Sequence, residues 1–406
     1  MRGALSGLRV VERCGTMGQY AGKLLGDMGA DVVKVEPPGG SEARGVGPFV
    51  DDVPGPNRSL GFWYFNTNKR SVVLDLGEAG GREAWMALVG AADIVIEDGR
   101  PGELSNLGLG YEEAAARNPG LIWCAITPFG QDGPWARFEA TDLVSLALGG
   151  AMMMNGYDAE DAEGAPPIRG HGDQGWLTGC HYAVQGILAA LLWRDRTGEG
   201  QFVDCSVHEA ISSTTEVALP YWFTKRVDVI RQTGRHAAAA PTERWLYRAA
   251  DGRWTLIFGV GRDNASWKQI KEWFQGEGFG RQFDEPRFDE PLNRQVGRGS
   301  PEAAEIAMEL ERFIAAHGAE EVYRGGQERR QAWGVVRSPE ENLADPHWSD
   351  RGFWVAVEGE GREGSPVRMP GAPYRFGATP WALRRPAPKL GEHTAEVLKE
   401  WLGREM

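Results

Sequence analysis

Cysteine is scarce in this sequence, and the few residues that occur are scattered. The 406 residues contain four, Cys14, Cys124, Cys180 and Cys205, with no CxxC pair and no Cys/His spacing typical of a metal site. Isolated cysteines of this kind are usually buried and reduced. The sequence therefore predicts neither a disulfide framework nor a bound metal.

Long hydrophobic runs are also missing. The longest apolar stretches, such as residues 183–193, are too short to cross a bilayer. Residues 1–11 contain neither the apolar run nor the small-residue cleavage site of a signal peptide. We therefore expect a cytoplasmic protein without a membrane partner.

Positive charge is in deficit, with 44 Lys and Arg against 57 Asp and Glu, so the formal net charge is −13. A general nucleic-acid binder needs clustered Lys and Arg for phosphate contacts, and this balance argues against one. It still allows a local basic pocket for a small anion. With 42% hydrophobic and 25% charged residues, the composition is that of a globular protein long enough for two or more domains.

Short motifs that would identify a common enzyme class are absent. Gly15, Gly18 and Gly22 follow the first predicted strand, but their spacing is wrong for the GxGxxG dinucleotide fingerprint. The sequence has no Walker A loop, no GxSxG elbow and no HExxH pair. His181 lies within an apolar helical pattern and is interpreted as a core or interface residue. The residues alone thus indicate no self-evident catalytic constellation.

The first half of the chain alternates between strand and helix patterns. Strands separated by helix-length segments predict βαβ units and a mainly parallel sheet. The predicted strands are 8–12, 31–36, 71–76, 93–97, 121–126 and 202–206, and the predicted helices are 19–28, 81–89 and 176–194.

The pattern changes from about residue 227. Asp251-Gly252 predicts a hairpin turn, and helical patterns follow over 266–274 and 301–317. A proline-rich stretch then leads to a short predicted helix at 394–402. We predict an α/β fold whose parts are a large Rossmann-like domain over 1–226, a smaller α+β domain over 227–335 and a return segment over 336–406.

Six short segments resemble, in order, those of CoA-transferase family III, and together they extend over almost the whole chain. Each is weak alone, but the common order is specific. They include an RPG…LGL element, an RxxTGxGQxVD turn and a closing PxLGEHT pattern. The segments are 5–12, 24–40, 66–76, 100–109, 194–204 and 386–394.

The resemblance implies a Rossmann-like domain built from both chain ends, a smaller middle domain, and two subunits interlocked as rings. It also implies transfer of CoA from an acyl-CoA to a free carboxylic acid. In the family an Asp attacks the thioester carbonyl and forms a mixed anhydride while CoA thiolate leaves. The acceptor carboxylate then receives the CoA through a second anhydride and an enzyme-bound thioester. Coenzyme A or acyl-CoA is thus the implied cofactor or substrate, with no metal.

The nucleophile is the main departure from the family pattern. The family Asp lies eleven residues before the Ile of the GILAAL helix and four before a Gly. Counted from Ile187 and Gly179, these positions hold Trp176 and Gly175, and neither side chain can attack a thioester. The nearest carboxylate is Asp173, which is either the nucleophile after a small alignment gap or a loop or helix-capping residue.

The basic residues that the family places near the CoA phosphates are also depleted. The matching positions hold Gly77, Asn106 and Glu139, and an acidic residue there opposes phosphate binding. The remaining cations, Arg70 among them, are interpreted either as phosphate contacts or as surface charges and partners of Glu36 or Glu97. The CoA-binding set that the resemblance implies is Arg44, Lys69, Leu74, Asp98, Arg100 and Leu107.

Three hypotheses about function remain open. The first is the non-catalytic subunit of a heteromer, such as the succinyl-CoA:(R)-benzylsuccinate type, whose related partner subunit carries the Asp. The second is an active homodimer that uses Asp173, and the third is a binding or scaffold protein that kept the fold without CoA chemistry. The racemase branch of the family is disfavoured, because its His–Asp pair corresponds to Thr141 and Asp142, and Thr cannot transfer the proton at neutral pH.

Overall fold

The chain divides into two compact units in the computed structural model. The larger unit combines residues 1–149, 170–214 and 345–406, and the smaller combines 150–169 and 215–344. The prediction, with boundaries at 226 and 335, likewise separated a middle domain from a domain built from both chain ends. It did not assign residues 150–169 to the middle domain. The structure describes residues 3–158, 161–216, 218–242, 244–261, 263–290, 299–357 and 365–403.

The larger unit is built on a six-stranded parallel sheet. Its strands are β1 (Arg9–Arg13), β2 (Asp31–Glu36), β3 (Lys69–Val73), β4 (Ile94–Glu97), β5 (Ile122–Thr127) and β6 (Gln201–Ser206). Their order is β3-β2-β1-β4-β5-β6, so the winding reverses between β1 and β4. In such sheets a crevice opens at this reversal, beyond the carboxyl ends of the strands.

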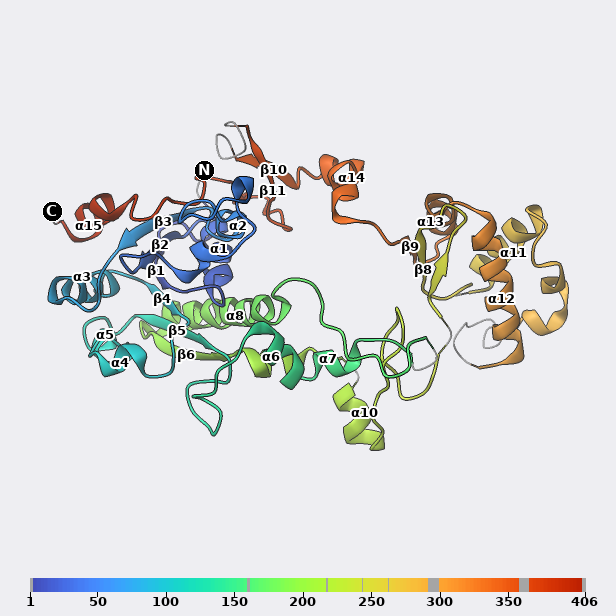
Figure 1. Cartoon of the computed structure of the whole chain (residues 1–406), viewed down its shortest axis with the longest axis horizontal. Helices are drawn as coiled ribbons and strands as arrows, with labels where there is room; N and C mark the ends of the chain where they lie inside the picture. The colour runs from blue at the N-terminus through green and yellow to red at the C-terminus, as the bar shows by residue number, and fades with distance from the viewer. Residues whose placement is uncertain are drawn as a thin grey trace. The chain divides into compact units, whose positions relative to one another are not determined.

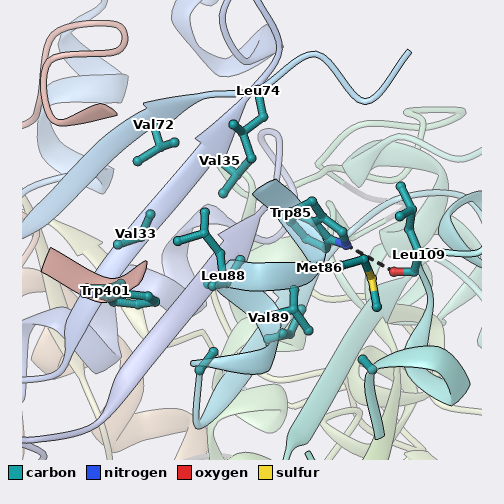
Figure 2. Close-up of a cluster of buried hydrophobic side chains, with 14 of the residues drawn as sticks. Val33, Val35, Val72, Leu74, Trp85, Met86, Leu88, Val89, Leu109 and Trp401 are labelled. Carbon is teal, nitrogen blue, oxygen red and sulfur yellow. Dashed lines mark hydrogen bonds between the residues drawn. The ribbon is translucent and has the colours of Figure 1, made fainter. Parts of the chain in front are cut away.

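Helices cover the sheet of the larger unit (Figure 1). α8 (Gln174–Thr197) packs on β5 and β6 and contacts α1 (Gln19–Asp27). α3 (Ala79–Gly90) covers an apolar cluster in which Trp85 is fully buried and donates its indole N–H to the Leu109 carbonyl at 3.1 Å (Figure 2). Burial on both faces explains why the central strands read as nearly continuous apolar runs.

The C-terminal helix completes this unit. α15 (Thr394–Leu402) contacts β3 and α3, and its Trp401 belongs to the same buried cluster as Val33 (Figure 2). The Trp401 indole N–H also donates to the Asp31 carboxylate at 3.1 Å. The return segment therefore supplies part of the core of the larger unit.

Shorter elements connect these parts of the larger unit. They are α2 (Leu60–Phe65), α4 (Glu103–Asn106), α5 (Tyr111–Ala115), α6 (Asp142–Leu148), α9 (Val207–Ser213), α14 (Pro346–Asp350), and the antiparallel pair β10 (Trp354–Val357) and β11 (Val367–Pro370). The larger unit also contains the short 3₁₀ helices Glu42–Gly45 and Val50–Asp52, and the smaller unit contains Arg281–Asp284, Pro286–Phe288 and Pro339–Leu343.

The smaller unit has its own aromatic core under a three-stranded antiparallel sheet. Phe274 and Phe313 stack in it with ring centroids 4.1 Å apart, and both are fully buried. Its strands are β7 (Leu246–Arg248), β8 (Trp254–Ile257) and β9 (Trp333–Val335), and its helices are α7 (Ala151–Met154), α10 (Ala218–Lys225), α11 (Asn264–Gly276), α12 (Pro301–Ala316) and α13 (Ala319–Glu328).

The predicted α/β class with a parallel sheet is confirmed. The hairpin at Asp251-Gly252 is also present, between β7 and β8. The third strand was placed at 71–76 but spans Lys69–Val73, because Lys69 and Arg70 lie buried inside the larger unit rather than at its surface. The interlocked dimer stays a prediction.

Candidate functional site

The first turn of α8 is the place where the family pattern expects a nucleophile. Gly175 lies in this turn, and a Cβ there would come within 2.8 Å of Ile211 Cδ1 and 3.0 Å of Asp142 Oδ1. One turn later, a Cβ at Gly179 would lie 2.8 Å from a methyl group of Val207. The glycines thus let α8 approach α9 closely, and a longer side chain at position 175 has no room.

A buried carboxylate occupies the space beside this turn. Asp142, at the start of α6, is 2% exposed and accepts the backbone N–H of Trp176 at 3.0 Å. That N–H is the third of the helix, the one that a capping side chain usually accepts from. The positive end of the helix dipole favours a carboxylate at this point. Asp142 therefore acts as a cap for α8 from another helix.

Asp173 is the residue immediately before α8, and its side chain is exposed. It makes no side-chain capping bond to the helix, because Asp142 already holds the Trp176 amide. The structure therefore places Asp173 outside the first turn, while Gly175 and Trp176 occupy that turn. The assignment of Asp173 as nucleophile stays a prediction.

A second candidate region lies where the winding of the sheet reverses, between β1 and β4. Asp98 follows β4, and its carboxylate accepts the backbone N–H groups of Gly15 at 2.8 Å and of Gly18 at 2.8 Å. These amides stand at the start of α1, where dinucleotide-binding folds hold a phosphate. Glu42 accepts the next amide, that of Thr16, at 3.2 Å. The protein's own carboxylates thus fill the anion cradle at this helix terminus.

Replacing Asp98 with Asn should change the pH dependence of stability. Burial raises the pKa of Asp98 to about 6, although the Gly15 and Gly18 amides oppose the rise. The folded state then holds the proton at pH values where the unfolded state has lost it. The stability from this group is present at low pH and is lost as pH rises through about 6. We expect Asp98→Asn to reduce this fall in the free energy of unfolding. Urea unfolding at a series of pH values below and above about 6 measures it.

Glu97 is the control for that experiment, because burial raises its pKa to about 7 and it titrates nearby. Glu97→Gln should remove a separate part of the pH dependence of the unfolding free energy, centred near pH 7. An Asp98→Asn variant with the same slope as the unchanged protein would contradict the assignment.

Three of the cations predicted to contact CoA phosphates are buried in ion pairs. Arg44 is 2% exposed and Lys69 fully buried, and they pair with Glu36 at 2.6 Å and with Glu12 at 2.6 Å. Arg70 pairs with Asp31 and also with two carboxylates of α15. The alternative interpretation of Arg44, as a partner of Glu36, is confirmed.

The other predicted CoA-binding residues are dispersed. Leu74 is 7% exposed within the apolar cluster that contains Trp85, whereas Leu107 is 48% exposed at the surface. Arg100 has an exposed side chain and pairs at 2.5 Å with Glu139, the acidic residue noted in the sequence at a position where the family has a cation. The six predicted residues do not converge on one cluster of accessible positive charge, and their assignment to CoA stays a prediction.

Asp142 was noted in the sequence only for the racemase pattern, and its place at the first turn of α8 was not predicted. Nothing in the sequence links it to Trp176, because their contact depends on how α6 packs against α8. Within the described residues, no group of three or more His, Cys, Asp or Glu side chains is placed to hold a metal ion. No helix in that part of the chain is long and apolar enough to cross a membrane.

Comparisons with known proteins agree with this architecture. The sequence model of CoA-transferase family III matches residues 5–394. The succinyl-CoA:(R)-benzylsuccinate CoA-transferase subunit BbsE of Thauera aromatica is 35% identical over 97% of this chain and 93% of that protein. The succinate–glutarate CoA-transferase of Agrobacterium fabrum is 34% identical over 98% of this chain and 95% of that protein. The crystal structure of a CaiB/BaiF family protein from Brucella suis has a TM-score of 0.82 at 28% identity and covers 99% of this chain and 100% of that one. This chain belongs to CoA-transferase family III.

Proposed function

We propose that this chain is the subunit without the nucleophile in a heteromeric CoA-transferase, and that a related partner subunit supplies the catalytic Asp. The observation that carries the proposal is the first turn of α8, which holds Gly175 and Trp176 where the family pattern has its Asp. The relative from Thauera aromatica is itself named as a subunit, which supports the same interpretation.

The space around that turn supports the proposal further. A carboxylate at position 175 would lie against Asp142, since even a Cβ there reaches 3.0 Å from Asp142 Oδ1. Two carboxylates at such a distance repel each other and cannot both ionise readily. The residues of this chain therefore favour a capped, closely packed helix start over a reactive one.

In the proposed complex the partner's Asp attacks the thioester of an acyl-CoA and forms a mixed anhydride, and CoA thiolate leaves. A free carboxylic acid then accepts the CoA through the second anhydride and the enzyme-bound thioester. This chain contributes the shared fold and the surface on which the partner assembles. The donor and acceptor are an acyl-CoA and a carboxylic acid, and the complex acts in the cytoplasm.

The exposed side of α8 supports assembly with a second chain. Tyr182, Leu192 and Trp193 lie along this helix and are 39%, 61% and 50% exposed. Large aromatic and aliphatic side chains on one helix are typical of a surface that another protein covers. A homodimer would cover the same side chains, so this observation supports assembly with a second chain of either kind.

The test is purification of the native complex followed by separate assays of each subunit. We expect this chain to copurify with a related chain that carries the family Asp, and to transfer no CoA alone. Incubation of the complex with acyl-CoA should label only the partner with a hydroxylamine-sensitive acyl group. Asp173→Asn in this chain should leave kcat of the complex unchanged.

The two alternatives give different results in the same experiment. An active homodimer would be labelled at Asp173, and Asp173→Asn would abolish both the label and the transfer. A binding or scaffold protein would show no CoA-dependent labelling either alone or with a related chain. Either result would reject the subunit proposal.

A further inference from the structure

Arg231 in the smaller unit carries a guanidinium that lacks a protein partner. Its Nη1 atom is buried, and no acceptor for it lies among the residues that the structure describes. The side chain crosses Gly156, where a Cβ would come within 3.0 Å of Arg231 Cδ, so a glycine allows this close approach. A buried charged donor without an acceptor is unfavourable. A ligand that supplies an acceptor at this point would remove that cost.

Arg231 lines a cavity of about 530 Å³ in the same unit. This volume lies within the range of small-molecule sites. Met153, Tyr157 and Ile230 also line the cavity and are 60%, 46% and 41% exposed, so the apolar wall continues to the surface. A cavity with an apolar wall and one cationic donor fits a ligand with one anionic group and an apolar body.

The other guanidinium groups of the cavity are already neutralised. Arg235 holds both carboxylate oxygens of Asp158, at 2.9 and 3.2 Å, and Arg244 pairs with Asp161. Each pair carries no net charge. Of the described residues at the cavity, Arg231 therefore leaves one positive charge uncompensated.

The loop around Arg231 is held by a network of buried and partly buried polar groups. Gln232, the next residue, is 2% exposed, and its side-chain oxygen accepts the Thr242 amide at 2.7 Å. Thr233 donates its amide to Asp158 at 3.1 Å, and Ile230 pairs with Ala238 through backbone hydrogen bonds. The network positions Arg231 in advance, which reduces the ordering that a ligand must cause.

We propose that this cavity binds a monoanionic organic carboxylate, with its carboxylate on Arg231 and its apolar body against Met153, Tyr157 and Ile230. Arginine binds both carboxylate and phosphate through paired N–H donors. The single uncompensated charge matches a carboxylate, because a phosphate monoester carries nearly two charges at neutral pH. The site does not depend on which subunit holds the nucleophile. The acid is either the one that receives CoA or one that binds without being consumed.

The test is a titration of the full chain with phenylacetate and, separately, with its neutral counterpart phenylacetamide. Saturation-transfer NMR measures the binding of each compound. We expect the acid to bind at least about tenfold more tightly than the amide, since a charge-assisted pair is lost with the amide. Arg231→Gln should weaken phenylacetate by a similar factor. Arg248→Gln, a matched loss of charge on β7 of the same unit, should leave the affinity unchanged.

Stability separates a binding role from a structural one. Arg231 makes no hydrogen bond within the described chain, so Arg231→Gln should melt no lower than the unchanged protein. Equal affinities for the acid and the amide, or for Arg231→Gln and the unchanged protein, would overturn the proposal, as would stronger binding of inorganic phosphate. In an assay of the assembled enzyme, a raised KM for the acid in Arg231→Gln would identify the CoA acceptor. An unchanged KM would identify an acid that is not consumed.

Discussion

Glu12→Ala is expected to lower the free energy of unfolding by about 3–5 kcal/mol, because it breaks a buried ion cluster and leaves two ammonium groups without their carboxylate. Glu12, Lys34 and Lys69 are all fully buried, and Glu12 lies between the two lysines at 2.8 and 2.6 Å. Gly22 of α1 makes room for the carboxylate, since a Cβ there would fall 1.7 Å from its oxygen. Urea unfolding at neutral pH measures the loss.

The pKa values of the lysines explain why the carboxylate matters. Burial lowers the pKa of Lys69 to about 8, with Glu12 opposing the change. Burial also disfavours the charge on Lys34, but Glu12 and Glu36 outweigh it and raise the pKa of that residue. Without Glu12, both ammonium groups would be buried with weaker compensation, and Lys69 would lose its proton at a still lower pH.

An exposed ion pair provides the control for Glu12. Arg100 and Glu139 pair at 2.5 Å, but their side chains are 80% and 77% exposed. Solvent screening makes such pairs contribute little, so Glu139→Ala should unfold like the unchanged protein. A Glu12→Ala variant as stable as Glu139→Ala would show that the buried cluster contributes nothing.

Arg44→Ala should cause a loss of comparable size, about 3–5 kcal/mol, and should act on stability rather than on CoA binding. The guanidinium binds both oxygens of Glu36 at 2.6 and 2.8 Å, the Pro388 carbonyl at 3.0 Å, and Pro56 and Asn57 at 3.0 Å each. All of its donor nitrogens are therefore used within the protein. Removing it leaves Glu36, which is 1% exposed, without its main partner.

Acid pH adds a second measurement for Arg44. Burial disfavours the charge on Glu36, but Arg44, Lys34 and Ser71 together outweigh this, with Arg44 the main contributor, and hold its pKa below the ordinary 4.5. The stability from Glu36 is therefore present above that value and is lost as pH falls through the lowered pKa. In Arg44→Ala the loss should already be present at neutral pH, so acidification should destabilise the variant less.

Arg44→Lys distinguishes geometry from charge. Lysine keeps the charge but lacks the planar array of donors, so we expect it to recover only part of the stability. If Arg44 instead binds a CoA phosphate, as the family resemblance implied, Arg44→Ala would unfold normally and raise KM for acyl-CoA in the assembled enzyme. Unfolding and steady-state kinetics on one variant thus decide between the two roles.

The sequence predicted the elements of the larger unit well because their signals are local. The apolar run at 31–36 predicts a strand, and β2 forms there. The glycine at 198 predicts a turn, and α8 ends there. Each of these signals lies within a few neighbouring residues. The predicted α11 and α12 in the smaller unit have the same kind of signal, strengthened by the caps at Asp263 and Ser300.

The roles of charged residues could not be predicted in the same way. Lys69 is buried because parallel pairing across β1, β2 and β3 brings it to Glu12, and no periodic pattern encodes that contact. Asp142 reaches Trp176 only through the packing of α6 on α8. Arg231 belongs to no motif, and its importance follows from a missing acceptor rather than from its sequence neighbours.

The position of α15 has a consequence for the order of events on the ribosome. Val397 and Trp401 share a buried cluster with Val33 and Val72, so that cluster stays open until the whole of α15 has been synthesised. The smaller unit, apart from 150–169, is a continuous stretch over 215–344 whose aromatic core is complete earlier. Domains generally fold as they emerge, with the N-terminal one first. In this chain the smaller unit can finish folding before the parallel sheet, although most of that sheet is synthesised first. Until α15 is synthesised, a nascent chain would expose the apolar face of β2 and β3 to chaperones.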